Sequence, residues 1–281
     1  MLNKITDHPK TSKSKIMTVL GIVLILIILG LLAYCGIISY RGVQAARQKY
    51  FQEVANLKKK DVEITIIEGW RREQIAAKLV KLDVLSSPDE FLKSTENLEG
   101  QLFPDTYRFF KNSTAQGVVD KIIKNFAKKT AGLKVDNTTL ILASIIEREA
   151  AGDEERAPIA GVYKNRIDEG MKLEADPTAQ YARDSQQIAA RDERPFVSTF
   201  EFWAPITKAE INATDSPYNT YRYAGLPPGP VCNPGSKSIE AALNPKLGQN
   251  FYFFHDADGT IRFSRNLADH DYQKKIYGVR Q

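Results

Sequence analysis

The feature that most constrains this chain is a long uncharged run near its N-terminus. No Asp, Glu, Lys or Arg occurs between Ile16 and Tyr40, and the middle of the run is almost entirely Leu, Ile and Val. As a helix, about 25 residues at about 1.5 Å each cover about 37 Å, which is enough to cross a bilayer. The sequence therefore predicts one transmembrane helix over residues 16–40.

Basic residues flank this run on both sides, so the positive-inside rule gives only a slight preference for a cytoplasmic N-terminus. A cleaved signal peptide is an alternative, although the run is long for one and lacks a small-x-small exit. A lipoprotein site at Cys35 is another, although Tyr34 is bulky where a small residue is required. We expect a retained single-pass anchor, with residues 1–15 as a cytoplasmic tail and residues 41–60 as a juxtamembrane helix.

Composition excludes several classes of protein. The net charge is +5, from 39 basic and 34 acidic residues, and the basic excess is spread over short runs. Nucleic-acid binding is therefore not indicated, whereas an anionic polymer would suit this balance. Cys35 and Cys232 lie far apart in the sequence, and the three histidines show no ligand spacing, so we expect no disulfide framework and no structural zinc.

The residues that follow the membrane segment predict a small α/β unit. Residues 61–67 alternate and are rich in β-branched side chains, which is typical of a strand. Helical spacing follows over residues 70–82, and Ser87-Pro88 is a typical helix start. The stretch from Ile66 to Trp70 and the helix after it resemble LysM-type glycan-binding modules. A plain α/β packing unit remains the alternative.

The rest of the chain predicts a mixed α+β domain. Its second half is rich in Pro and Gly, which fix the shape of loops between residues 173 and 235. A turn at Ala257-Asp258-Gly259 predicts a hairpin. Helices are expected at 115–131, from Asp136 to the glutamate pair, at 153–169 and at 267–277.

The helix that begins after Asp136 is apolar until it reaches Glu147 and Glu149. Burial favours the protonated form of a carboxyl group, and a carboxyl that keeps its proton near neutral pH can act as a general acid. Both glutamates lie on apolar faces of the helix, so geometry alone does not choose between them. We favour Glu149, on the stripe of larger residues nearest the helix end. The alternative is a structural ion pair, for example with Arg148 or Arg166.

Several separated motifs follow one another in the chain. They are Ala143 to Glu149, Asp176-Pro177-Thr178, Tyr218 to Tyr221, Gly225 to Pro230 and Asn233-Pro234-Gly235, with Leu102 to Tyr107 before them and Phe251 to His270 after them. This constellation, which covers about residues 62–277, resembles the endolytic murein transglycosylases of the MltG, or YceG-like, family.

The resemblance implies a single-pass protein of the bacterial cytoplasmic membrane whose catalytic side is extracytoplasmic. It implies a LysM-like subdomain at 61–97 and a catalytic domain at 98–281. The expected activity is cleavage of peptidoglycan between N-acetylmuramic acid and N-acetylglucosamine, leaving a 1,6-anhydro end. Such cleavage would terminate or trim nascent strands, with peptidoglycan synthases as candidate partners.

In this family the catalytic glutamate lies in the motif carried here by Glu147-Arg148-Glu149. The resemblance assigns it to Glu149, because the second glutamate best matches the Glu-Ser/Thr step of other lytic transglycosylases. Ala150 departs from that pattern, so a hydroxyl partner is missing. The resemblance implies that one acid suffices, without a metal or cofactor, because the C6 hydroxyl of the muramic sugar would be the nucleophile, whereas most glycosidases need two carboxylates. The attack is intramolecular, so positioning supplies much of the rate.

Nine further residues are expected to bind the glycan. The Asn-Thr-Tyr triplet at residues 219–221 would hydrogen-bond N-acetyl groups, and Tyr181 would stack on a sugar. The Asp-x-Thr motif at residues 176–178 would line the cleft, and the proline loop at residues 227–229 would form a wall. These residues are Asp176, Thr178, Tyr181, Asn219, Thr220, Tyr221, Pro227, Pro228 and Gly229. The tyrosines are equally consistent with core or rim positions, and the proline loop with simple closure of the fold. We expect His255 and His270 to be structural.

Two other functions remain open. A muramidase would cut the same bond with water and needs a second carboxylate, for which Asp176 and Asp215 are candidates. A non-catalytic glycan-binding scaffold for wall synthesis would use the anchor and the LysM-like unit without the glutamates.

Overall fold

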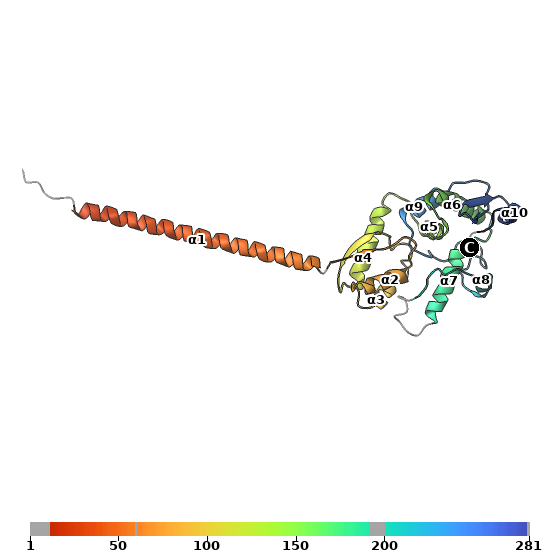
Figure 1. The fold of residues 1–281 in the computed structure, drawn as a ribbon, viewed down its shortest axis with the longest axis horizontal. Helices are drawn as coiled ribbons and strands as arrows, with labels where there is room; N and C mark the ends of the chain where they lie inside the picture. The colour runs from red at the N-terminus through yellow and green to blue at the C-terminus, as the bar shows by residue number, and fades with distance from the viewer. Residues whose placement is uncertain (1–11, 60, 191–199, 280–281) are drawn as a thin grey trace, which may run out of the picture. The chain divides into compact units, whose positions relative to one another are not determined.

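The computed structural model describes residues 12–59, 61–190 and 200–279, and the chain divides into two compact units between Lys60 and Asp61 (Figure 1). The first unit contains one helix, α1 (Ser12–Lys59). Its stretch Ile16–Val54 has a mean hydropathy of 3.1 in its most apolar window and none of that window is buried. The predicted run is therefore helical, and α1 is long and apolar enough to cross a membrane.

The second unit begins with a two-stranded antiparallel sheet of β1 (Asp61–Thr65) and β2 (Thr106–Phe110). The register pairs Asp61 with Phe110 and Thr65 with Thr106. Three helices pack with this sheet around one hydrophobic cluster: α2 (Arg72–Lys81), α3 (Asp89–Ser94) and α4 (Ala115–Lys129). Because β1 finds its partner strand only at β2, this packing unit extends past the expected boundary at residue 97.

A second group of elements surrounds α5 (Asn137–Glu149), whose residues from Leu140 to Ile146 are all buried. Asp136 caps α5 by accepting a hydrogen bond from the backbone of Thr139, as predicted. The helix packs against elements from the rest of the chain: α6 (Asp153–Asp168), α7 (Asp176–Ala189) and α9 (Ser236–Leu243).

The predicted hairpin is present as β3 (Tyr252–His255) paired with β4 (Ile261–Ser264), and α10 (Leu267–Tyr277) follows it. The mixture of helices and short strands agrees with an α+β fold. Two helices lie within the stretch 173–235, where only loops were expected: α7 and α8 (Lys208–Ala213). Pro177 was interpreted as part of a loop, but it lies in the first turn of α7, where its missing N–H needs no partner.

Candidate active site

The two glutamates of α5 have different surroundings although only one residue separates them. Glu147 accepts a hydrogen bond from Arg156 Nη1 at 3.1 Å through one oxygen and from the backbone N–H of Gly235 at 2.9 Å through the other. Its side chain is only 6% exposed. Glu147 thus forms a structural ion pair, which was the alternative to a catalytic role in the sequence analysis. Its partner is Arg156, not Arg148 or Arg166.

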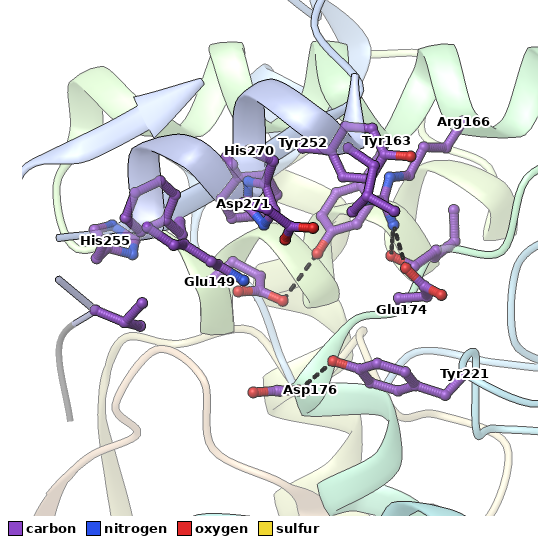
Figure 2. Close-up of a pocket in the computed structure, with 16 residues that line it drawn as sticks. Glu149, Tyr163, Arg166, Glu174, Asp176, Tyr221, Tyr252, His255, His270 and Asp271 are labelled. Atoms are coloured by element: carbon purple, nitrogen blue, oxygen red, sulfur yellow. Dashed lines mark hydrogen bonds and ion pairs between the residues drawn. The ribbon is translucent and has the colours of Figure 1, made fainter. Parts of the chain in front are cut away.

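Glu149 is the last residue of α5, and the backbone leaves the helix at Ala150 in an extended conformation. Its carboxyl group lines a pocket of about 560 Å³. Tyr163 Oη donates a hydrogen bond to Glu149 Oε1 at 2.8 Å, and no ion pair to Glu149 occurs within the described part of the chain (Figure 2). Because α5 ends here, no further turn of helix covers the carboxyl group.

Burial raises the pKa of Glu149 to about 7. The hydrogen bond from Tyr163 lowers this pKa, the negative charge of Asp176 raises it, and the positive charges of Arg166 and Arg148 lower it. A carboxyl group with a pKa near neutrality is populated in both protonation states, which is the property required of a group that gives and takes back a proton.

The pocket is formed by elements far apart in the sequence. Its walls come from α5, α6, the start of α7, the loop that carries Tyr221, the β3–β4 hairpin and α10. Figure 2 shows Glu149 and Tyr163 on one side of the pocket and the Tyr221–Asp176 pair on another, where Tyr221 Oη donates to Asp176 Oδ1 at 2.6 Å. Two of the predicted substrate residues therefore share a pocket with Glu149.

Arg166 forms hydrogen bonds with several of the segments that line this pocket. Its guanidinium donates to the carbonyl oxygens of Phe251, Lys172 and Leu173, and it lies 4.9 Å from the ring centroid of Tyr252. Because Arg166 is on α6, these bonds fix both the hairpin and the segment before α7 to the helix that carries Tyr163.

Three predicted substrate residues lie outside the lining of this pocket. Thr178, Asn219 and Thr220 are at most 1% exposed. The two threonine hydroxyls bond each other at 2.8 Å, and the Asn219 amide donates to the carbonyl oxygens of Ile211 and Thr214. Their side chains are committed to protein partners and hold the two segments that present Asp176 and Tyr221.

The remaining predicted residues also lie away from Glu149. Tyr181 lines a different pocket, where its ring lies 4.0 Å from the guanidinium carbon of Arg71 and 4.8 Å from the ring of Tyr218. Gly229 lies against the hydroxyl of the same Tyr218. Pro227 is buried and Pro228 is exposed.

Several pocket residues carried no usable sequence signal. Tyr163 lies within a helix of mixed polarity, and His255 and His270 were interpreted as structural, yet all three line the pocket. Over the described residues, no three His, Cys, Asp or Glu side chains are grouped as metal ligands require. The chemistry that the arrangement offers is proton transfer by Glu149 within a polar cleft that other carboxyl groups, among them Asp176, also line.

Both the sequence and the fold of this chain have counterparts among known proteins. The YceG-like family model matches residues 44–276. This chain belongs to the YceG-like family. It is 32% identical over 253 residues to an endolytic murein transglycosylase of Bacillus subtilis, covering 76% of this chain and 65% of that protein. It is 33% identical over 185 residues to an endolytic murein transglycosylase of Streptococcus pneumoniae, covering 62% of this chain and 31% of that one.

The chain therefore spans less than two thirds of the length of these relatives. A YceG-like protein of Listeria monocytogenes, solved as a crystal structure, matches with a TM-score of 0.58 and 28% identity, over 75% of this chain and 76% of that one. The fold of this YceG-like chain is thus also found in an experimental structure.

Proposed function

We propose that this chain is a membrane-anchored lytic transglycosylase that cleaves peptidoglycan strands between N-acetylmuramic acid and N-acetylglucosamine. The observation that carries the proposal is the position of Glu149, a carboxyl group with a pKa of about 7 in a polar pocket. The names of the Bacillus and Streptococcus relatives supply the substrate class.

In the proposed reaction Glu149 donates its proton to the glycosidic oxygen as the bond from that oxygen to C1 of the muramic sugar breaks. The resulting carboxylate then accepts the proton of the C6 hydroxyl, whose oxygen bonds to C1 and closes the 1,6-anhydro ring. Glu149 returns to its starting state, so one carboxyl group completes the cycle. Asp176 and Tyr221, which line the same pocket, are proposed to contact the reacting sugar.

The other predicted residues are proposed to act through the shape of the cleft. Thr178, Asn219 and Thr220 would hold the Asp176 and Tyr221 segments by the bonds already described. Tyr181 and the loop Pro227-Pro228-Gly229 would border the path of the strand farther from the acid.

The anchor gives the proposed location. We assign residues 16–40 of α1 to the bacterial cytoplasmic membrane, residues 1–15 to the cytoplasm, residues 41–60 to a stalk and residues 61–281 to the extracytoplasmic side. Residues 61–97 are proposed as a LysM-like glycan contact and residues 98–281 as the catalytic domain, whose β2 and α4 pack on residues 61–97. In this location the enzyme would terminate or trim nascent strands beside peptidoglycan synthases.

The test uses the full chain, purified in detergent, on isolated sacculi. Mass analysis of the soluble products distinguishes 1,6-anhydro ends from the reducing ends that a muramidase would leave. We expect anhydro ends from the wild-type chain and none from Glu149→Gln. Absence of release by the wild-type chain would favour a non-catalytic scaffold.

A muramidase is the second candidate because Asp176, a second carboxylate, lines the pocket of Glu149. In that case Asp176 would activate water, and products would carry reducing ends. Asp176→Asn would then abolish cleavage rather than weaken substrate binding.

A further inference from the structure

His270 of α10 lines the pocket of Glu149 but has no part in the reaction described so far. The residue is 7% exposed, and its ring centroid lies 5.3 Å from those of both Tyr252 and Phe254. Its Nδ1 atom is buried without a hydrogen-bond partner, and among the described residues none bonds to Nε2 either. A buried polar atom without a partner is costly, which applies to Nδ1, whereas Nε2 is not among the buried atoms and is the nitrogen that a molecule in the pocket can reach.

Four other polar side chains that line the pocket are already engaged in hydrogen bonds. Tyr163 and Tyr221 each donate their hydroxyl to a carboxylate, and Arg166 donates to backbone carbonyl oxygens. His255 bonds Glu155 at 3.0 Å. His270 therefore differs from these neighbours in having its hydrogen-bonding capacity available to a molecule in the pocket.

The imidazole is uncharged at neutral pH. Burial lowers the pKa of His270 to about 4, the positive charges of Lys274 and Arg166 also lower it, and Asp271 raises it. A neutral imidazole has one donor and one acceptor nitrogen. It matches an amide, which also offers one donor and one acceptor, and it brings no positive charge of its own to an anionic group.

The surroundings of His270 add an apolar requirement. Tyr252, Phe254 and Leu267 line the same pocket. A ligand group that matches both features has an amide dipole next to a small apolar end. We propose that His270 hydrogen-bonds the acetamido group of an N-acetylated sugar in this pocket, with the acetyl methyl group against the neighbouring apolar side chains. The proposal rests on the proposed function for its carbohydrate substrate, and it makes His270 a specificity-determining residue.

The test compares two uncharged tetrasaccharides, tetra-N-acetylchitotetraose and cellotetraose, which carries hydroxyls where the former carries acetamido groups. Binding to the full chain in detergent is measured by NMR titration for wild type, His270→Phe and His270→Gln. His270→Phe keeps an aromatic ring without its nitrogens, and the Gln amide restores a donor and an acceptor. Tyr272→Phe is the matched control, because Tyr272 is exposed on the same helix and outside the pocket lining.

We expect the wild-type chain to prefer the N-acetylated sugar and His270→Phe to bind it about tenfold more weakly, the cost of one buried hydrogen bond. Cellotetraose binding should not change, and His270→Gln should recover part of the preference. Should thermal unfolding show that His270→Phe does not fold, a preference in folded His270→Gln equal to that of the wild type would overturn the proposal, because only partial recovery is expected. Equal binding of the N-acetylated sugar by wild type and folded His270→Phe would overturn it as well.

The outcomes of this binding test do not depend on whether the proposed function is correct. A wild-type chain that releases anhydro products while His270→Phe binds the N-acetylated sugar normally would refute only the role of His270. A chain that releases no products from sacculi but shows the His270-dependent preference would refute the reaction and leave the acetamido site in place.

Discussion

Tyr163 donates a hydrogen bond to Glu149 Oε1 at 2.8 Å, and each side chain shifts the pKa of the other. Burial beside Glu149 raises the pKa of Tyr163 well above its ordinary value, so the phenol keeps its proton throughout the neutral range. Oε1 is then occupied as an acceptor, and the transferable proton of Glu149 belongs on Oε2. Phe253 of the hairpin meets the Tyr163 ring edge-on at 5.7 Å and holds it in place.

Replacing Tyr163 with Phe tests this relationship. The hydrogen bond lowers the pKa of Glu149, so its loss raises that pKa and moves the alkaline limb of activity to higher pH. The freed carboxyl group also loses its orientation, and we expect kcat to fall roughly three- to tenfold with little change in KM. The measurement is kcat and kcat/KM for anhydro-product release as a function of pH.

Tyr107→Phe supplies the control for this variant. Tyr107 is also buried, and its hydroxyl donates to the carbonyl oxygen of Phe103, in the lobe formed by β1 and β2. The same atom is removed, so a comparable loss of stability of about 1 kcal/mol is expected, while the pH profile should stay unchanged. If the alkaline limb of activity stays at the wild-type pH in Tyr163→Phe, the role assigned to the Tyr163 hydroxyl is contradicted.

The pKa of Glu149 predicts the pH profile of the wild-type chain. A general acid works in its protonated form, so kcat/KM should fall as pH rises through about 7, the value to which burial raises this carboxyl. The profile between about pH 5 and about pH 9 checks it. Activity that stays constant to the upper end would exclude Glu149 as the proton donor in the free enzyme.

Local sequence signals anticipated the parts of the fold that depend on local rules. Asp136 predicted the start of α5, and Ala257-Asp258-Gly259 predicted the β3–β4 turn, because capping and turn formation involve neighbouring residues. The start of α7 was missed because Asp176-Pro177 fits both a loop and a first helical turn, and only tertiary packing decides between them.

The same distinction between local signals and tertiary packing applies to the candidate site. The apolar helix ending in two glutamates indicated an unusual carboxyl group, but only the position of Arg156, on another helix, shows that Glu147 is the paired one. Tyr163 and His270 reach the pocket from α6 and α10, and no spacing in the sequence encodes that meeting. Asn219 was expected in the pocket, yet its amide is used within its own loop.

Glu147→Gln should impair folding rather than chemistry. Glu147 and Arg156 form an ion pair whose side chains are 6% and 11% exposed, and without it Arg156 keeps only its pair with Asp153. Loss of a buried hydrogen bond between charged groups costs about 1.5–3 kcal/mol. Chemical denaturation should show the lower stability, while turnover per folded molecule stays near that of the wild type. Glu240→Gln, an exposed substitution on α9, is the control and should change neither quantity.

Glu99 provides a stability test that is independent of activity. It is 8% exposed and accepts hydrogen bonds from the Asn233 amide at 2.6 Å and from the backbone N–H of Arg72. Burial raises its pKa to about 8, and the negative charge of Glu73 adds to the increase. The folded chain therefore holds this proton more tightly than the unfolded chain, in which the ordinary value of 4.5 applies.

The direction in which stability changes with pH follows from this difference in pKa. The contribution of Glu99 to stability is complete below a pH of about 4.5 and is lost as pH rises through about 8, at up to about 1.4 kcal/mol per pH unit. Glu99→Gln keeps the shape but has no proton to lose, so its unfolding free energy should fall less between about pH 6 and about pH 9 than that of the wild type. Urea unfolding at both values measures this, with exposed Glu96→Gln as the control. Parallel losses in Glu99→Gln and wild type would show that Glu99 is already ionised in the folded chain at neutral pH.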